Sequence, residues 1–375
     1  MHEDSRAWVE IDLGALAYNS AQLRSHLPKG CNLMAIVKAD AYGHGAERVA
    51  ERLWDEGVKA FAVATLSEGI RLREKGLDGD ILVLSYTHPR DAALLSDYRL
   101  AQLIVDGAHA KAMNDTGYKM HVHIAIDTGM RREGIVVSNL AELESIFKYK
   151  NLSVEGVATH LSSSDSLSED DDKFTKRQIE RFFSAVDCLK SKGYNTGKLH
   201  FQASYGIFNY PDIRCDYARA GIGLYGLMSH DEETRVRLDL RPALSLKAVI
   251  AQTRWISSGE SVSYGRTFTA DKPMKLATIC IGYADGVPRH MSGNNGACIV
   301  NGSRAPIIGR ICMDLLMADV TEVESAVPGD VATLIGKDGA EAIRCEEVAK
   351  ASGTITNEIL CRLGSRLPRI YKKES

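Results

Sequence analysis

The sequence predicts an α/β protein in which a (β/α)8 TIM-type barrel over residues 12–236 is followed by a mainly β domain over residues 237–375. Between residues 30 and 225, short apolar runs rich in β-forming residues alternate with helix-like segments. After about residue 235 the apolar runs become longer, and hairpin signals separate them. The 375 residues, 45% of them hydrophobic and 25% charged, are enough for one large and one smaller domain.

The expected barrel strands are the eight apolar runs Leu33–Val37, Phe61–Ala64, Ile81–Leu84, Gln102–Val105, His121–Ile126, Val154–Thr159, Leu199–Gln202 and Tyr217–Ala220. The longest intervening helix is marked by apolar residues at helical spacing, namely Phe174, Ile179, Phe182, Val186 and Leu189. Acidic residues 170–172 favour the N-terminus of this helix.

The acidic, serine-rich stretch 162–172 is expected to be a solvated loop rather than a metal site. His121 and His123 share one strand face without a third ligand, and are expected to be structural.

The second domain shows a clear hairpin signal in Ala297–Ile308, where Asn301 and Gly302 favour a tight turn. The segment Ala7–Asp12 precedes the first barrel helix and is expected to pair with this domain. Residues 1–11 are therefore assigned to the second domain as an N-terminal strand.

The bulk composition excludes several classes of protein. A net charge of -3 provides no basic excess for nucleic-acid binding. Eight cysteines without a C-x-x-C pair argue against a zinc ribbon or a disulfide framework, and fit a reducing cytoplasm. No apolar run approaches the roughly 18 residues of a membrane span, and the first residues lack a signal-peptide core. The chain as given is expected to be cytoplasmic.

The run Ala35–Gly45 places Lys38 where an apolar strand gives way to a glycine-rich turn. A lysine at the end of a buried strand is well placed to form a Schiff base. Tyr42 adds a hydroxyl, and Gly43 and Gly45 allow the backbone to approach a ligand closely.

Other polar residues follow the expected strands, and in such a barrel the chemistry gathers at the C-terminal ends of the strands. The residues expected to face one pocket there are Lys38, Arg132, His160, Ser204, Arg219, Gly221 and Ile222. Phosphate sites in these barrels commonly use the loops after strands seven and eight. The Ser204 hydroxyl, the amides of Gly221 and Ile222, and the Tyr42 hydroxyl are the expected phosphate donors.

The run at Lys38 resembles the pyridoxal-phosphate lysine motif of the alanine racemase family, and the resemblance covers nearly the whole chain. Ser261–Phe268 is similar to the family segment that holds the second catalytic base, which implies that role for Tyr264. Gly282–Arg289 and Gly309–Asp314 match two further motifs and imply that Tyr283, Met313 and Asp314 lie near the substrate. The family active site is completed across a homodimer, so the tyrosine base would come from the partner subunit.

The resemblance also implies a mechanism, in which pyridoxal phosphate serves as the electron sink. Lys38 would hold the cofactor and act as the base on the D-isomer face, and Tyr264 of the other subunit would act on the L-isomer face. His160 and Arg219 would connect the tyrosine to the cofactor ring, with Arg219 donating to the pyridine nitrogen. Because arginine stays protonated, that nitrogen would remain unprotonated.

Two residues depart from the family pattern. Ala125 stands where many members carry a carbamylated lysine that orients the substrate-pocket arginine, so a chloride or a water is expected to orient Arg132. Asn357 stands in Thr354–Cys361 where the family usually has a tyrosine. Asparagine is smaller and offers both a donor and an acceptor, so it can admit a hydroxymethyl side chain and hydrogen-bond to it.

The asparagine makes serine the expected substrate, with alanine secondary. This feature resembles the catalytic domain of the VanT-type serine racemases of vancomycin-resistant bacteria, which carry an N-terminal membrane domain and supply D-serine for peptidoglycan precursors. A membrane domain preceding this chain is one expectation from that resemblance. The alternatives are an alanine racemase with a relaxed pocket and a non-catalytic pyridoxal-phosphate carrier, which lacks the second domain.

Overall fold

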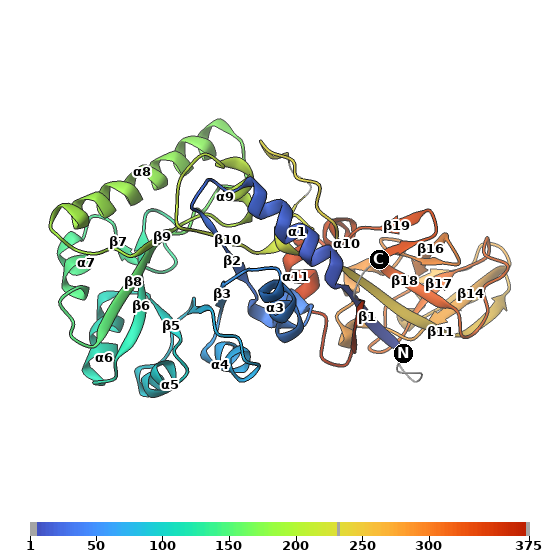
Figure 1. Cartoon of the computed structure of the whole chain (residues 1–375). Helices are drawn as coiled ribbons and strands as arrows, with labels where there is room; N and C mark the ends of the chain where they lie inside the picture. Colours follow the sequence, from blue (N-terminus) through green and yellow to red (C-terminus); the bar gives the residue numbers. More distant parts are fainter. Residues whose placement is uncertain (1–5, 231–232, 373–375) are drawn as a thin grey trace.

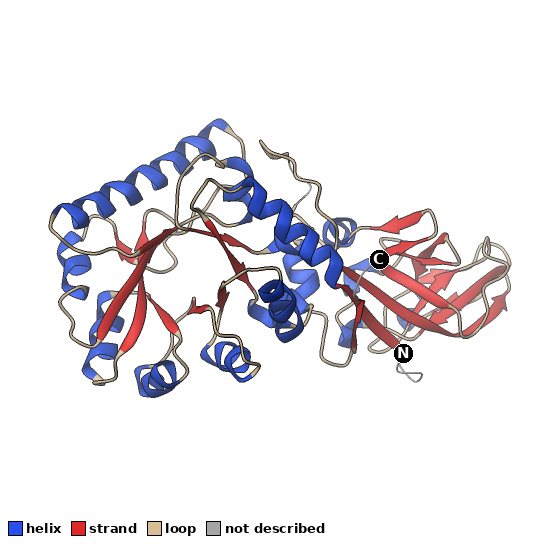
Figure 2. Ribbon diagram, viewed as in Figure 1, coloured by secondary structure: helices blue, strands red, loops and turns tan. Residues whose placement is uncertain are grey.

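The computed structural model describes residues 6–230 and 233–372. It consists of a barrel surrounded by helices and, beside it, a unit made mostly of strands (Figures 1 and 2). The first and last strands of the described residues both belong to the strand-rich unit (Figure 1). Of the expected N-terminal strand, residues 1–5 lie outside the described residues.

The barrel is closed and parallel. Its strands are β2 (Asn32–Ile36), β3 (Ala60–Val63), β4 (Asp80–Val83), β5 (Ala101–Ile104), β6 (Met120–Asp127), β8 (Leu152–Ala158), β9 (Lys198–His200) and β10 (Tyr217–Ala220). The sheet runs β5-β4-β3-β2-β10-β9-β8-β6, and pairing of β5 with β6 closes the ring. The short strand β7 (Ile135–Val136) pairs only with β6. Each predicted run overlaps one of these strands, so the predicted barrel is confirmed.

Helices pack around the outside of the barrel. They are α1 (Leu13–His26), α3 (Ala46–Asp55), α4 (Leu66–Glu74), α5 (Ala92–Asp97), α6 (Gly107–Asp115), α7 (Leu140–Ile146), α8 (Glu169–Ser191) and α9 (Ser204–Asn209). In α8 the Ser168 side chain accepts from the Asp171 amide, and acidic residues occupy the first turn. Residues 169–172 of the expected loop therefore belong to the helix. The predicted apolar face is buried at Ile179, Phe182, Val186 and Leu189.

The second unit is built on a nine-stranded sheet in the order β19-β18-β15-β16-β17-β14-β11-β1-β20. Its strands are β1 (Ala7–Asp12), β11 (Leu244–Ile256), β14 (Met274–Ile279), β15 (Ala297–Val300), β16 (Ser303–Ile308), β17 (Leu316–Asp319), β18 (Val331–Asp338), β19 (Glu341–Ile343) and β20 (Arg369–Lys372). As expected, β1 pairs with this domain, antiparallel to β11 and parallel to β20.

Shorter elements complete this unit. A separate ribbon pairs β12 (Ser261–Val262) with β13 (Phe268–Thr269), and two helices lie between β19 and β20 in the chain, α10 (Cys345–Ala351) and α11 (Thr356–Cys361). The predicted hairpin is confirmed: β15 and β16 are joined by Asn301 (φ 48°) and Gly302 (φ 74°), the two positive φ angles of a type I′ turn.

The described residues lack both a membrane-spanning helix and a metal-binding cluster. Over the described ranges, no helix combines the length and apolar character needed to cross a membrane. The same residues contain no group of three or more His, Cys, Asp or Glu side chains able to hold a metal ion.

Candidate active site

A cavity of about 530 Å³ opens where the barrel strands end. All of the barrel residues predicted from the sequence line it: Lys38, Tyr42, Arg132, His160, Ser204, Arg219, Gly221 and Ile222. Asn357 reaches the same cavity from α11, which is a helix of the C-terminal part of the chain. The cavity lining does not include the second predicted group, the residues that the resemblance placed near the substrate: Tyr264, Tyr283, Met313 and Asp314. A single chain therefore gathers the barrel residues around the cavity without these four.

Lys38 is positioned by a left-handed turn, α2 (Lys38–Gly43). The four residues Ala39–Tyr42 each have φ of 53°, a conformation that costs about 1–2 kcal/mol for each non-glycine residue. The turn is fixed on either side, because the Ala39 amide donates to Glu68 (2.7 Å) and the Ala46 amide donates to Asp40 (2.8 Å). Lys38 begins this turn and lies two residues beyond the end of β2.

The surroundings of Lys38 favour its neutral form. Burial, and then the nearby cation of Arg132, lower the pKa of the Lys38 amine. Lys38 also has no hydrogen bond or ion pair with any described residue. A lowered pKa increases the neutral fraction of the amine, and the neutral amine is the form that reacts with a carbonyl carbon.

The part of the cavity where β9 and β10 end forms a tight cradle of hydroxyl and amide groups around Ser204 and Gly221. Ser204 opens α9, and its Oγ accepts hydrogen bonds from the amides of Gly221 and Gly223, both at 3.1 Å. A Cβ at Gly221 would lie 2.8 Å from the Tyr42 hydroxyl oxygen, so only glycine allows this approach. The cradle therefore brings together the groups that the sequence predicted for a phosphate, namely the Ser204 hydroxyl, the amides of Gly221 and Ile222, and the Tyr42 phenol. The Gly221 amide donates to Ser204 Oγ rather than pointing free into the cradle.

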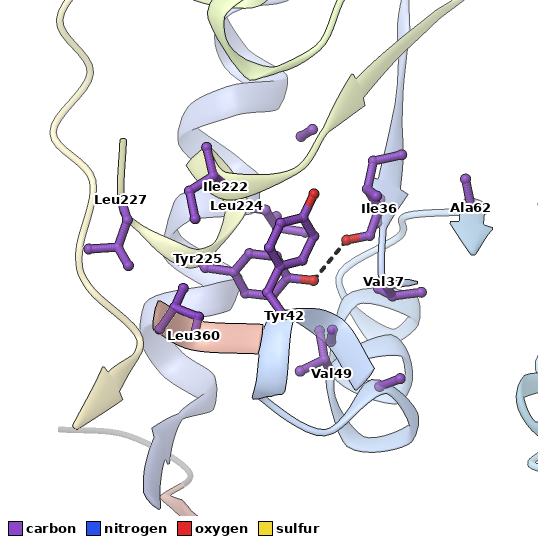
Figure 3. Packing of buried hydrophobic residues seen from close by; sticks show 14 of the residues in the cluster. Ile36, Val37, Tyr42, Val49, Ala62, Ile222, Leu224, Tyr225, Leu227 and Leu360 are labelled. Atoms are coloured by element: carbon purple, nitrogen blue, oxygen red, sulfur yellow. Dashed lines mark hydrogen bonds between the residues drawn. The ribbon is translucent and has the colours of Figure 1, made fainter. Parts of the chain in front are cut away.

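Tyr42 is held by packing rather than by a hydrogen bond. Figure 3 shows its ring beside that of Tyr225, with the centroids 5.0 Å apart, and the Tyr225 hydroxyl donates to the Ile36 carbonyl (2.8 Å). Burial raises the pKa of Tyr42 well above its usual value, so the phenol keeps its proton. Its hydroxyl has no partner among the described residues and remains available as a donor.

Arg219 is buried inside the barrel, and its two terminal nitrogens are fully engaged. Nη1 donates to His200 Nδ1 (2.8 Å) and to the His200 carbonyl (3.0 Å), and Nη2 donates to the Thr159 carbonyl (2.8 Å) and to His160 Nδ1 (3.1 Å). Burial lowers the pKa of Arg219 to about 10, which still leaves it protonated at neutral pH. Its Nε has no partner among the described residues, and the side chain lines the cavity.

These hydrogen bonds fix the protons of three histidines. Arginine can only donate, so His160 Nδ1 and His200 Nδ1 must accept, and each of these rings carries its proton on Nε2. His200 Nε2 then donates to His123 Nδ1 (2.8 Å). Burial, and for His160 also the cation of Arg219, lower the pKa of His160 to about 3 and that of His123 to about 4, so both rings stay neutral.

His200 is a site residue that the sequence reasoning missed. It lies inside a predicted strand, and nothing in its local sequence marks it as the partner of Arg219. The one available signal was strand alternation, because His200 lies two residues before Gln202 in the predicted strand Leu199–Gln202 and so shares a strand face with another polar residue. His123 was expected to be structural, and it is a buried partner of His200 rather than a residue of the cavity lining.

Asn357 is oriented by another residue that was not predicted. The Ser229 hydroxyl donates to Asn357 Oδ1 (2.7 Å), and Thr356 anchors the start of α11 by donating to the Met228 carbonyl (2.8 Å). Helix α11 also packs closely on the Lys38 turn, where a Cβ at Gly43 would lie 2.4 Å from the Leu360 carbonyl. With Oδ1 occupied, the Asn357 amide nitrogen is the group free to meet a ligand.

The substrate-pocket arginine is less constrained. Arg132 lines the cavity and is exposed, and it makes no hydrogen bond to a described residue. Ala125 lines the same cavity, and its methyl group offers no polar atom. The neighbouring Arg131 is the one that pairs with Asp127 (3.1 Å).

The second predicted group gathers on one edge of the β unit. The side chains of Tyr264, Tyr283 and Met313 are 69%, 43% and 52% exposed. The backbone beneath them is well fixed: the Tyr283 amide donates to the Cys312 carbonyl (3.1 Å), and the Ser263 hydroxyl donates to the Arg310 carbonyl (2.6 Å). Thus three motifs separated in sequence present their side chains outward on one surface.

Asp314 belongs to an ion-pair cluster at this edge. Arg366 donates to Asp314 (2.6 Å), and Arg6 donates to the Asp314 carbonyl (2.9 Å) and to both carboxylate oxygens of Asp285 (2.8 and 3.0 Å). Asp285 is fully buried and also accepts from the Gly282 amide (3.0 Å). The cluster therefore joins the turn that carries Tyr283 to the loop that carries Asp314.

Comparison with known proteins gives matches over nearly the whole chain. The family model for the alanine racemase N-terminal domain matches residues 11–229, and the model for the alanine racemase C-terminal domain matches residues 243–371. The two matched regions contain every residue of the cavity described above, and also Tyr264, Tyr283, Met313 and Asp314, whereas Arg6 precedes the first region.

Individual relatives agree with these matches. An amino-acid racemase of Enterococcus faecalis is 41% identical over 97% of this chain and 51% of its own length. An alanine racemase of Carboxydothermus hydrogenoformans is 40% identical over 97% of this chain and 99% of its own length. A serine/alanine racemase of Enterococcus gallinarum is 38% identical over 96% of this chain and 51% of its own length. The chain thus spans about half the length of two of these relatives.

Solved structures show the same fold. An alanine racemase of Clostridium difficile 630 matches with a TM-score of 0.91 and 33% identity, over 98% of this chain and 96% of that one. The alanine racemase of Bacillus anthracis with bound L-Ala-P matches with a TM-score of 0.91 and 32% identity, over 98% and 95% of the two chains. Sequence, fold and the residues of the cavity lead to one conclusion: this chain belongs to the alanine racemase family, the amino-acid racemases that use pyridoxal 5'-phosphate.

Proposed function

We propose that this chain is a two-base racemase that interconverts L-serine and D-serine, with alanine as a secondary substrate. The observation that carries the choice of serine is the position of Asn357, which lines the cavity with its Oδ1 held by Ser229 at 2.7 Å. The amide nitrogen is left to donate to a substrate hydroxyl. A positioned polar partner of this kind discriminates more strongly than a gain or loss of space.

The cavity fits pyridoxal phosphate chemically. Lys38 Nζ, Tyr42 Oη and Arg219 Nε are three donors with no partner among the described residues, and all three side chains line one cavity. Lys38 would hold the cofactor covalently. Ser204, Tyr42 and the amides of Gly221 and Ile222 would hold its phosphate. Arg219 would donate to its ring nitrogen, and His160 would lie beside the ring.

When bound, the cofactor withdraws electrons from the substrate Cα and makes its hydrogen acidic. In the proposed reaction Lys38 Nζ removes or returns the proton on the D-isomer face, and Tyr264 Oη does so on the L-isomer face. Arg219 keeps its own proton and so leaves the ring nitrogen unprotonated. His160, with its proton on Nε2, is the group that donates to the tyrosine oxygen and stabilises the phenolate.

We infer that Tyr264 is supplied by a second copy of the chain. In its own chain Tyr264 is 69% exposed and lies outside the cavity, together with Tyr283 and Met313. Exposed aromatic side chains on a well-ordered edge are typical of a protein interface. In the proposed homodimer each cavity receives this edge from the partner, and Tyr283, Met313 and Asp314 complete the substrate pocket.

We propose that the enzyme works in the cytoplasm and that its product, D-serine, is used for modified peptidoglycan precursors of the kind associated with vancomycin resistance. Support comes from the Enterococcus gallinarum relative, which is described as a serine/alanine racemase. The rival is an alanine racemase with a wider pocket, and the names of several relatives favour it.

Initial racemisation rates on L-serine and L-alanine decide between the two. We expect a larger kcat/KM for serine, and a fall of the serine-to-alanine ratio by about ten- to a hundredfold in Asn357→Tyr, since a lost hydrogen bond to a hydroxyl is worth about 1–3 kcal/mol. Ser229→Ala should lower the ratio less, and Ser229→Thr, which keeps the hydroxyl, is the matched control. A wild-type kcat/KM for alanine well above that for serine would refute the proposed substrate.

A further inference from the structure

Two cysteines that are far apart in sequence lie in contact at the N-terminal end of the barrel. The Sγ atoms of Cys31 and Cys215 are 3.5 Å apart, although 184 positions separate the residues. Cys31 directly precedes β2, and Cys215 lies two residues before β10. These strands are neighbours, with Asn32 opposite Tyr217. Both cysteines are free thiols.

The backbone places these thiols suitably for a bond. Neighbouring strands lie about 4.8 Å apart, and Cys215 is offset along its strand by one residue, about 3.3 Å, from the position opposite Cys31. The two Cα atoms are therefore roughly 6 Å apart, which is inside the range of natural disulfides. The sulfurs have to approach by only about 1.5 Å, from 3.5 Å, to reach bonding distance. Rotation of the side chains supplies such a movement without a change of the barrel.

The two thiols differ in a way that suits oxidation. Cys31 is partly exposed and lines a surface depression, whereas Cys215 is buried. The Cys215 thiol has a single proton, which donates to Gln202 Oε1 while Cys31 is protonated. When Cys31 ionises, this proton can turn to the Cys31 sulfur 3.5 Å away, and that hydrogen bond lowers the pKa of Cys31 because it stabilises the thiolate. Cys31 is therefore the nucleophile that an oxidant in solution meets, and Cys215 is the thiol placed to resolve the product.

We propose that Cys31 and Cys215 form a reversible oxidation site at which a hydroperoxide joins the two sulfurs and ties the start of β2 to the start of β10. With hydrogen peroxide as the oxidant, the Cys31 thiolate attacks one peroxide oxygen, the O–O bond breaks, and a sulfenic acid and hydroxide form. The hydroxide takes up the proton that the Cys31 thiol released and becomes the first water. The Cys215 sulfur then attacks the Cys31 sulfur, the S–O bond breaks, and a second water leaves with the last thiol proton. The two thiols are oxidised to a disulfide, and the peroxide is reduced to two waters.

Gln202 connects this disulfide to the active site, so formation of the bond is expected to lower the racemisation rate. The Cys215 thiol donates to Gln202 Oε1 (3.3 Å), and the Gln202 backbone carbonyl accepts from the Arg219 amide (3.0 Å). Formation of the disulfide consumes the thiol proton and leaves the buried Oε1 without that donor. Strand β2 leads to Lys38 and β10 carries Arg219, so the tied strands are those that carry two central side chains of the cavity.

The test uses the full chain loaded with pyridoxal phosphate and treated with hydrogen peroxide. Peptide mapping after alkylation of free thiols should show a Cys31–Cys215 disulfide, with the loss of two hydrogen atoms, that dithiothreitol reverses. The racemisation rate, taken with the faster of serine and alanine, should fall as the bond forms and recover on reduction. The mapping does not depend on the proposed substrate, so it separates failure of this site from failure of that proposal.

Cys215→Ser and Cys31→Ser should abolish the bond and the reversible loss of rate. Cys188→Ser is the matched control, because Cys188 is also a partly buried free thiol but lies on α8 away from this pair. Alkylation of both Cys31 and Cys215 in the peroxide-treated wild type would overturn the proposal. So would a sulfinic acid that accumulates on Cys31 without a bond to Cys215. A disulfide that forms with full retention of rate would overturn the link through Gln202.

Discussion

The two halves of the predicted active site are built in opposite ways. In the barrel half, Arg219 is 6% exposed and donates to His200 and His160, and His200 is fully buried. In the half carried by the β unit, Tyr264 is 69% exposed. The barrel half is complete within one chain, whereas the β edge has an ordered backbone whose functional side chains face outward.

The difference shows where each half obtains its precision. Both halves contain left-handed backbone next to the proposed bases: Ala39–Tyr42 after Lys38, and Ser263 (φ 67°) before Tyr264. Around Lys38, buried packing and hydrogen bonds hold the side chains as well as the backbone. Around Tyr264 they hold the backbone alone, so the position of the phenol is left to whatever surface covers it. In the proposed dimer that surface is the cavity of the partner.

The largest expected effect on kcat comes from two single substitutions, each of which removes the proposed base of one half. Lys38→Ala and Tyr264→Phe should each reduce kcat by about 10²- to 10⁴-fold or more, because a positioned general base contributes about that much. A mixture of the two inactive variants, refolded or coexpressed, should recover activity. A mixed dimer would contain one cavity with both native residues. If the mixture stays as inactive as its components, Tyr264 does not act across a dimer.

Arg219→Lys tests the buried network of the barrel half. Lysine cannot reproduce the fork that reaches His200, His160 and the Thr159 carbonyl, so these buried groups lose partners. We expect kcat to fall by about 10²-fold, in keeping with a loss of about 2–3 kcal/mol for charged hydrogen bonds. We also expect a change in the absorption spectrum of the bound cofactor, which a purely structural role of Arg219 would not alter.

Arg6→Gln tests the ion-pair cluster beneath the β edge. The substitution leaves buried Asp285 with Arg366, whose Nε is 3.5 Å away, as its remaining cation. We expect the free energy of unfolding to fall by about 1–3 kcal/mol, measured by urea denaturation. We also expect kcat to fall severalfold, because the cluster joins the turns of Tyr283 and Asp314.

Arg304→Gln is the control for Arg6→Gln. Arg304 pairs with the exposed carboxylates of Glu341 and Glu347, so its loss should change the stability by no more than about 1 kcal/mol. Equal effects of the two substitutions would mean that the cluster does not position the β edge.

The smallest expected effect concerns the charge around Lys38. Its pKa is lowered by burial and by Arg132, and only the neutral amine attacks the cofactor aldehyde. The rate at which the cofactor-free protein takes up pyridoxal phosphate should therefore rise with pH and level off above the Lys38 pKa. Arg132→Gln removes a cation and should move this profile to higher pH. A profile that moves to lower pH, or does not move, would contradict the assigned electrostatics.

Local patterns in the sequence were sufficient for much of the fold. Alternation of apolar runs and helical segments predicted the eight strands, since periodicity depends on neighbouring residues. Because barrel chemistry gathers at strand ends, Lys38, His160, Ser204 and Arg219 were predicted to share a pocket, which they do. Strand ends were less certain: Lys38 and His160 each lie two residues past the end of their strand.

By itself, then, the sequence determined the strands and helices, the turn at Asn301–Gly302 and the set of polar side chains at the mouth of the barrel, because each depends on local backbone preference or on the common direction of parallel strands. Only the tertiary structure decided which distant residues meet. Ser229 orients Asn357 across 128 positions, His123 meets His200 across 77, and Cys31 meets Cys215 across 184. Such contacts depend on how separate elements pack, and no local pattern specifies that packing.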